Sequence, residues 1–260
     1  MDDLVLRAGD AIARLDPLGG RLAQLTVADR QLLAPVTGPR TQAGCYPMVP
    51  WAGRLDRGRF SFAGTAHQMA ITMEPHAIHG LGTDAPWDVV APGVMQLDLD
   101  PLWPLGGVAE VRYQLTPTAI TCTLTVSATN AAFPAVLGWH PCFVRAVAGA
   151  ADTLGFEPGF MWTRGDDYLP TGTTEPSPPG PWDDCFGGVE ASPTIRWGDE
   201  FAVELRAPTA TWVVFDMLDT IVCVEPQTDT PNAFNLSGGT ILEPGDSLTL
   251  PFEIAWGSTT

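Results

Sequence analysis

Side chains that could transfer protons lie in four separate segments of this 260-residue chain. His76 and His79 stand in HAIHGLGTDAPW and His140 stands in GWHPCF; they are three of only four histidines. Arg54 lies in PWAGRL, and Glu225 lies in VEPQTDTPNAFN. Imidazole and carboxylate groups can give and take protons near neutral pH without a cofactor. If the fold brings these side chains together, the chemistry that suits them is proton transfer on a polyhydroxylated ligand.

The two histidines of the first segment have three interpretations. His76 and His79 form an HxxH pair, which could bind a metal ion if a helix or tight turn aimed both rings at it. Pro75 and Gly80 flank the pair and do not favour a helix, so we expect no metal. The rings could instead bond to the backbone of a loop, or they could hydrogen-bond to sugar hydroxyls.

His140 and Glu225 have surroundings that suit an acid and a base. His140 ends an apolar run, where a histidine is often only structural, but a nearby carboxylate would help it to keep its proton as a general acid must. Glu225 follows the apolar strand predicted over 221–224, so it either pairs with a partner or lies at the mouth of a site. A solvated strand end is the alternative for Glu225, and a solvated loop for Arg54.

The charge of the chain excludes several partners and mechanisms. Thirteen arginines and no lysine stand against 30 acidic side chains, which gives a net charge of −17. Because a field of that sign repels polyanions, we expect neither nucleic acid nor an anionic membrane as a partner. Phosphorylated or sulfonated substrates are disfavoured too, although a local arginine cluster could override the global field. Without lysine, a Schiff base and a P-loop are impossible, and there is no GxSxG elbow.

The cysteines and the apolar runs predict a protein of the reducing cytoplasm. Five cysteines with no CxxC pair give neither a complete disulfide framework nor a zinc ribbon. Cys122 and Cys223 lie in apolar strand-like runs and are expected in the core. No signal peptide is visible, and no apolar run approaches the roughly 18 residues of a membrane span.

Alternation with period two predicts an all-β fold, a β-sandwich or barrel of mostly antiparallel strands. The 25 prolines and 27 glycines disfavour long helices. Strands are predicted at 59–62, 87–90, 108–115, 119–129, 201–207, 211–215, 221–224 and 248–256.

Two features bear on the arrangement of these strands. Pro251 cannot donate to a ladder, which predicts an edge position or a bulge in the last strand. The proline-rich segment 170–184 could link two domains, but the strands on both sides of it look alike. We therefore expect a long surface loop within a single domain, residues 1–260.

Taken together and in order, the segments resemble the aldose 1-epimerase (galactose mutarotase-like) family, in its short bacterial form. PWAGRLDRGRFSFAGTAHQM is similar to the family's P-F-A-N-R-I stretch followed by G-R-F-x-F-x-G. HAIHGLGTDAPW is similar to its block with HxxHG and a final P-W, and GWHPCF to its H-P-Y-F block. VEPQTDTPNAFN resembles the block that holds the catalytic glutamate. LPTG with PWDDCF resembles the segment before the ligand-binding aspartate, and PLGGRLAQLTV resembles the first Gly-Gly turn.

The resemblance implies a β-supersandwich with one open cleft and a cofactor-free interconversion of sugar anomers. Glu225 would be the general base on the anomeric hydroxyl, and His140 the general acid at the ring oxygen. His79 and Arg54 would hold the ring oxygen and neighbouring hydroxyls. Asp183 would accept hydrogen bonds from hydroxyls.

The resemblance also leaves alternatives open. Asp184 is the other candidate for the aspartate. An epimerase of a phosphorylated or sulfonated hexose and a non-catalytic carbohydrate-binding sandwich are the alternative functions. Tryptophans next to the motifs, at 51, 87, 139 and 182, could stack on a sugar or lie in the core.

Two positions depart from the family pattern. Gly53 stands where the family usually has asparagine before the arginine, which predicts the loss of one hydroxyl contact. Thr83 stands where phosphate-specific relatives tend to carry arginine, which disfavours a hexose 6-phosphate. Arg57, Arg59 and Arg145 remain as candidate contacts for an anion.

Overall fold

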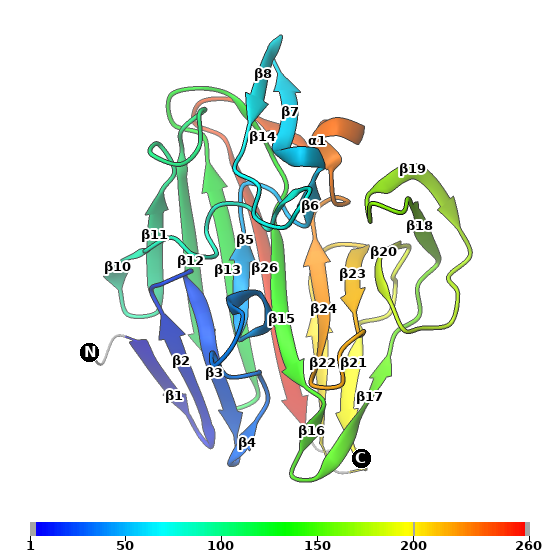
Figure 1. The fold of residues 1–260 in the computed structure, drawn as a ribbon. Coiled ribbons are helices and arrows are strands. Elements are labelled where there is room, and N and C mark those ends of the chain that lie inside the picture. The colour runs from blue at the N-terminus through cyan, green and yellow to red at the C-terminus, as the bar shows by residue number, and fades with distance from the viewer. Residues whose placement is uncertain (1–3, 200, 258–260) are drawn as a thin grey trace.

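The computed structural model describes residues 4–199 and 201–257, which fold into two large antiparallel sheets stacked as layers (Figure 1). The first sheet has eleven strands. In spatial order they are β1 (Val5–Ala8), β2 (Ala11–Asp16), β3 (Arg21–Val27), β5 (Cys45–Met48), β15 (Gly138–Val144), β24 (Ile221–Gln227), β23 (Thr211–Phe215), β20 (Asp183–Gly187), β18 (Phe160–Arg164) and β19 (Pro170–Glu175), with β4 (Arg30–Gln31) beside β3.

The second sheet has nine strands, and three short two-stranded ladders lie outside the two large sheets. The second sheet runs β10 (Asp88–Ala91), β11 (Val94–Asp98), β12 (Val108–Leu115), β13 (Ala119–Ser127), β26 (Ser247–Gly257), β22 (Phe201–Arg206), β21 (Thr194–Trp197), β17 (Ala150–Gly155) and β16 (Ala146–Val147). The short ladders pair β6 (Arg54–Leu55) with β9 (Ala77–Ile78), β7 (Arg59–Phe62) with β8 (Thr65–Gln68), and β14 (Phe133–Ala135) with β25 (Thr240–Leu242).

Helical structure in the described residues is confined to short turns. They are η2 (Arg40–Gln42), η3 (Asp56–Gly58) and α1 (Ala233–Leu236). None of the helices found there is long and apolar enough to cross a membrane. The all-β, antiparallel architecture predicted from the alternation is thereby confirmed.

The core lies between the two large sheets, where their apolar faces meet. Leu124 of β13 and Ile254 of β26 pack in the same buried cluster as Val224 of β24. The cluster is also fixed by a buried polar contact across the layers, because the Trp139 indole on β15 donates a hydrogen bond of 3.1 Å to the Leu250 carbonyl on β26. This bond satisfies the one polar atom of a ring that is otherwise suited to the core.

Strands β15 and β24 lie in the middle of the first sheet and present different chemistry on their two faces. Successive side chains of a strand point to opposite faces. One face carries apolar side chains that join the core: Trp139, Phe143, Val222 and Val224. The other face carries His140, Cys142, Cys223 and Glu225. Both strands are almost entirely buried, which is why the sequence shows continuous apolar runs here instead of a clear alternation.

One prediction about an element is wrong. The segment 170–184 is not one loop, because it contains β19 and the start of β20. Its threonines suit a strand, and Pro170 is tolerated as the first residue of an edge strand. The strands on both sides belong to the same sheet; the domain boundary, 1–260, stays a prediction.

Pro251 lies at a local edge position, as predicted, although β26 as a whole is paired on both sides, with β13 and with β22. The pairing with β22 ends at Glu253. At Pro251 the strand is therefore paired only with Thr123 of β13, and the missing N–H is accommodated without a bulge. A central strand thus tolerates the missing donor at a position where one of its neighbours has ended.

Candidate active site

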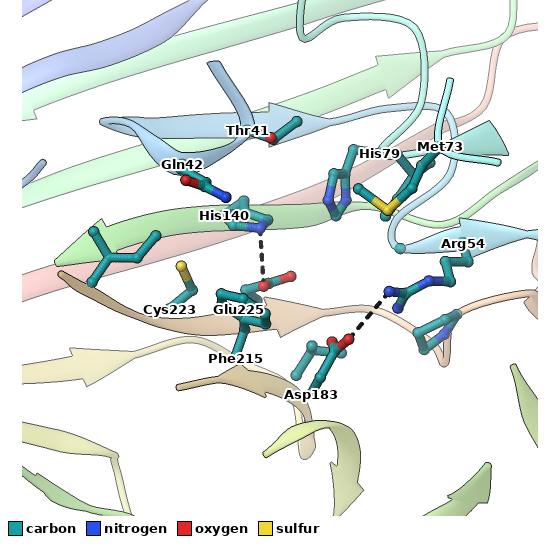
Figure 2. A pocket seen from close by; sticks show the side chains of 15 residues that line it. Thr41, Gln42, Arg54, Met73, His79, His140, Asp183, Phe215, Cys223 and Glu225 are labelled. Atoms are coloured by element: carbon teal, nitrogen blue, oxygen red, sulfur yellow. Dashed lines mark hydrogen bonds and ion pairs between the residues drawn. The ribbon is translucent and has the colours of Figure 1, made fainter. Parts of the chain in front are cut away.

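A cavity opens on the polar face of β15 and β24, and the β6–β9 ladder contributes Arg54 and Ile78 to its lining (Figure 2). Fifteen residues line it: Thr41, Gln42, Gly53, Arg54, Met73, Ile78, His79, His140, Asp183, Val213, Phe215, Ile221, Cys223, Glu225 and Pro231. All five residues predicted to act on a sugar are in this set, although they come from segments up to 171 positions apart (54 to 225). The cavity is therefore the candidate active site.

His140 and Glu225 form an ion pair on the floor of the cavity. The register pairs Gly138 with Gln227 and Cys142 with Cys223, so His140 and Glu225 face each other from neighbouring strands. His140 Nε2 lies 3.1 Å from Glu225 Oε1, and the two residues are only 6% and 2% exposed. Both lie inside their strands and not at strand ends. Because two neighbouring strands hold both side chains in place, one ligand can contact both groups.

Burial and mutual attraction set the charges of this pair. Burial raises the pKa of Glu225, the charge of His140 lowers it, and the net result is about 7. Burial alone would lower the pKa of His140, but the Glu225 carboxylate and Cys142 together outweigh burial and raise that pKa to about 9. Between these values the site holds a deprotonated carboxylate beside an imidazolium. This is the state that a base and an acid need before a reaction begins.

His79 lies next to the pair as a neutral ring. It follows β9 and has a positive φ of 61°, a conformation that costs energy outside glycine. Its ring meets that of His140 edge-on at 4.8 Å, and its Nδ1 lies 2.9 Å from the Met48 sulfur. Burial, and then the charges of His140 and Arg54, hold the pKa of His79 well below its usual range. His79 therefore offers hydrogen bonds without charge.

Arg54 and Asp183 form a second ion pair across the cavity from the first (Figure 2). Arg54 Nη2 lies 3.2 Å from Asp183 Oδ2. Asp184, the next residue on β20, points away and is bound to Arg164 at 2.5 Å. Strand alternation thus separates the two aspartates, and Asp183 is the one whose side chain reaches the cavity.

Cys142 contacts Nδ1 of His140, the ring nitrogen that does not face Glu225. Its sulfur lies 3.4 Å from His140 Nδ1 and 3.7 Å from the Thr41 carbonyl. Tyr46, the neighbour of His140 on β5, stacks on the imidazole with 4.6 Å between the ring centroids. These contacts fix the ring plane and direct Nε2 at Glu225.

Several residues singled out in the sequence lie outside the cavity. His76 is structural: its Nδ1 accepts from the Arg57 backbone at 3.1 Å, and its Nε2 lies 3.0 Å from the Asp167 carbonyl. With both ring nitrogens engaged, it does not converge with His79 on a metal. Thr83 is buried, and its hydroxyl donates to the His79 carbonyl at 3.3 Å.

None of the three arginines kept as candidate anion contacts lines the cavity. Arg145 binds Asp152 at 3.0 Å, and Arg59 binds Gln68 at 2.9 Å. Arg57 is exposed on η3.

The structure also shows where the four tryptophans next to the motifs and Gly53 lie. Trp51, Trp87 and Trp139 are buried in the core, and Trp182 packs against Phe186, so none of the four lines the cavity. Gly53 has a φ of 63°, and a Cβ there would lie 2.8 Å from Pro231. Pro231 thus occupies space next to the position where the family has an asparagine side chain.

Some residues at the site were missed in the sequence. Phe215 and Val213 line the cavity because they alternate on one face of β23, a pattern that the sequence does contain. Tyr168 had no signal: its ring lies 4.9 Å from the Arg54 guanidinium and 4.2 Å from that of Arg164. Tyr168 lies in the connection between β18 and β19, and its contact with Arg54 joins segments that no local pattern links.

Comparisons with known proteins agree with the resemblance seen in the motifs. The model of the aldose 1-epimerase family matches residues 3–180. YphB, an uncharacterized protein of Escherichia coli K12, is 26% identical over 253 residues, which cover 85% of this chain and 87% of that protein.

Solved structures show that the likeness extends to the whole fold. A galactose mutarotase-like protein from Clostridium acetobutylicum, 16% identical, superposes with a TM-score of 0.82 over 98% of this chain and 94% of its own. An aldose epimerase homologue from C. elegans, 15% identical, does so with a TM-score of 0.82 over 99% of both chains. The fold is thus the galactose mutarotase-like supersandwich, and with most of its length matched by the family model, the chain belongs to the aldose 1-epimerase family.

Proposed function

We propose that this protein is an aldose 1-epimerase that interconverts the α and β anomers of a free aldohexose by acid–base ring opening. The observation that carries the proposal is the buried pair of His140 and Glu225, 3.1 Å apart on the floor of an open cavity. The two oxygens that exchange protons during ring opening are bonded to the same sugar carbon. An acid and a base held this close together suit such neighbouring atoms.

The proposed reaction needs only these two side chains. Glu225 takes the proton of the anomeric hydroxyl while His140 gives its Nε2 proton to the ring oxygen, and the bond from the anomeric carbon to the ring oxygen breaks. Rotation about the bond between C1 and C2 then presents the other face of the aldehyde. In the closing step His140 takes back the proton of the ring hydroxyl, and Glu225 returns its proton to the carbonyl oxygen. Both groups end in their starting states, so no cofactor is consumed.

The remaining polar side chains would position the sugar. Neutral His79 can hydrogen-bond near the ring oxygen without competing with His140 for charge. Arg54 can donate to hydroxyls, and Asp183 can accept from them. Because these two are already paired at 3.2 Å, the pair offers donors and acceptors side by side to vicinal hydroxyls.

The main alternative is a carbohydrate-binding protein without catalysis on the same fold. A binding site gains nothing from an imidazolium placed against a carboxylate, because desolvating both charges is costly. The raised pKa values of both groups support the enzyme.

A polarimetric panel tests the proposal. Freshly dissolved α-anomers of glucose, galactose and other aldoses are followed with and without the protein. We expect at least one free aldohexose to reach its equilibrium rotation faster in proportion to protein concentration. Binding of a sugar with no acceleration for any member of the panel would favour the binding protein.

A further inference from the structure

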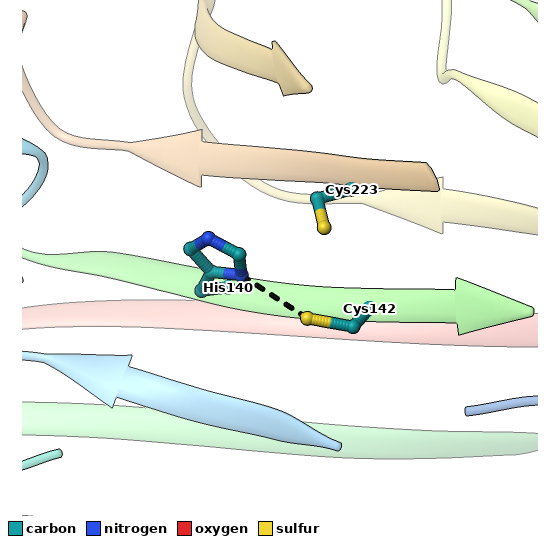
Figure 3. Close-up of side chains that lie close together, drawn as sticks. All are labelled: His140, Cys142 and Cys223. Carbon is teal, nitrogen blue, oxygen red and sulfur yellow. Dashed lines mark hydrogen bonds between the residues drawn. The ribbon is translucent and has the colours of Figure 1, made fainter. Parts of the chain in front are cut away.

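The floor of the candidate active site contains a cluster of soft ligand atoms that the proposed reaction does not use (Figure 3). One ring nitrogen of His140 and the sulfurs of Cys142 and Cys223 all lie within 4.8 Å of one another, and all three residues are buried. Within residues 4–199 and 201–257, no other set of three or more histidine, cysteine, aspartate or glutamate side chains converges in this way.

The sheet holds this cluster in place. Cys142 and Cys223 are paired directly across β15 and β24, and His140 lies two residues before Cys142 on the same face. The His140 nitrogen that faces the cluster is Nδ1, 3.4 Å from the Cys142 sulfur. Both cysteines are free thiols. The ligand atoms therefore come from two neighbouring strands and not from a mobile loop.

We propose that His140, Cys142 and Cys223 bind one thiophilic metal ion, for which Zn²⁺ is the representative, and that the bound ion switches off the active site. Zn–S bonds of about 2.3 Å and Zn–N bonds of about 2.0 Å place tetrahedral ligand atoms roughly 3.5–4 Å apart. The 3.4 Å contact is close to this spacing, and the 4.8 Å limit leaves shifts of only about 1 Å for the other atoms.

The donor set selects the kind of ion. Two sulfurs and an imidazole suit zinc and its soft relatives, whereas Mg²⁺ and Ca²⁺ require oxygen ligands. Three protein ligands leave the fourth tetrahedral position for water. His140 and Cys223 both line the cavity, which supplies the water and the route of entry.

Occupation of this site would remove the acid of the proposed reaction. An imidazolium has a proton on each nitrogen, whereas a metal on Nδ1 replaces one of them. A metal-bound His140 is therefore no longer the imidazolium that gives up a proton in the proposed reaction. The inhibition rests on the proposed function, but the binding does not.

Binding is tested first, with Zn²⁺ alone added to the purified protein in a reductant that contains no thiol. Calorimetry or competition with a chromophoric chelator should show one tightly held ion per chain. Cys142→Ala and Cys223→Ala should each weaken binding on the order of 100-fold or more, since each removes a ligand. Cys122→Ala is the matched control: Cys122 is a buried thiol beside Cys45 in the core, and its loss should leave zinc binding unchanged.

Cobalt provides a readout that needs no variant. Co²⁺ at this site should show the absorption of thiolate-to-metal charge transfer, and excess Zn²⁺ should abolish it. The site is refuted if the wild-type protein shows no such absorption and no zinc binding, or if folded Cys142→Ala and Cys223→Ala variants bind zinc as tightly as wild type.

The activity measurement is separate. With a sugar that the protein turns over, one equivalent of Zn²⁺ should stop catalysis, Mg²⁺ should not, and a chelator should restore the full rate. Full activity with zinc bound would overturn the inhibitory role. If no aldose is turned over at all, the proposed function fails, while zinc binding still decides the metal site.

Discussion

At the scale of single residues, Glu225 is the side chain on which the proposed reaction depends most. Glu225→Gln keeps the size of the side chain but replaces a carboxylate by an amide, which is too weak a base to take the hydroxyl proton, so we expect the rate of anomer exchange to fall on the order of 10²–10⁴-fold. Polarimetry with the aldose that the wild-type protein turns over fastest measures this rate. Glu243→Gln, an exposed carboxylate, is the matched control and should keep full activity. A Glu225→Gln variant within a few-fold of wild type would remove Glu225 from the mechanism.

The protonation of the same pair predicts the pH dependence. The raised pKa of Glu225, about 7, means that the base is lost as the pH falls below that value. The raised pKa of His140, about 9, means that the acid is lost as the pH rises above it. We therefore expect kcat/KM to be greatest between about 7 and 9, with both limits belonging to the coupled pair.

The pH profile is measured after subtraction of the uncatalysed rate at each pH. A maximum near pH 5, where an ordinary solvated carboxylate would suffice, would show that burial does not tune the pair.

Five site residues could be predicted from the sequence because their types match the chemistry and their motifs resemble a family. The structure brings all five to one cavity; their roles stay predictions. Cys142 could not be assigned, because its contact with His140 Nδ1 arises from strand alternation inside a run that is buried on both faces. Where both faces of a strand are buried, the sequence does not show which face meets the cavity.

At the scale of elements, strands with clear alternation were predictable. Val108–Leu115 and Thr211–Phe215 have the predicted bounds, because buried side chains on one face alternate with less buried ones on the other. The pairing of β15 with β24 could not be predicted, since no local signal links strands that are 77 positions apart (144 to 221). Yet this pairing places the acid opposite the base.

The turn after β9 predicts a strong effect of one glycine. Gly80 has a φ of 73°, and a Cβ there would lie 2.1 Å from the Val49 carbonyl oxygen. Gly80→Ala therefore adds a backbone clash to the strain of the left-handed conformation and should lower the free energy of unfolding by on the order of 3 kcal/mol or more. Because Gly80 follows His79, activity should fall as well.

Gly64 provides the control for this prediction. It has a φ of 78°, but a Cβ there would meet nothing within 4 Å. Gly64→Ala should cost only about 1 kcal/mol, the strain alone. Denaturant unfolding compares the two variants. Equal losses would show that the close approach of Gly80 to Val49 does not constrain the turn.

At the scale of the whole molecule, acidic side chains outnumber basic ones by 30 to 13, and many of the arginines are already neutralised. Arg145 pairs with Asp152, Arg164 with Asp184, and Arg206 with Glu204 and Glu253. An anion that approaches the cavity therefore meets a repulsive field.

This distribution predicts that free aldohexoses are turned over with a higher kcat/KM than their 6-phosphates. Salt screens the global field beyond about 8 Å, so contacts inside the cavity must decide the preference. Among the described residues, Arg54 is the only arginine that lines the cavity, and Asp183 already binds it at 3.2 Å. A phosphate would have to displace that carboxylate and remain beside it, whereas neutral hydroxyls can use the pair as it stands. Steady-state kinetics on glucose, galactose and their 6-phosphates measures the preference. The Asp183→Asn variant tests the cause: if it turned over the 6-phosphate better than the free sugar, the Asp183 carboxylate would be what excludes anions. In the wild-type protein, a higher kcat/KM for glucose 6-phosphate than for glucose would contradict the preference itself.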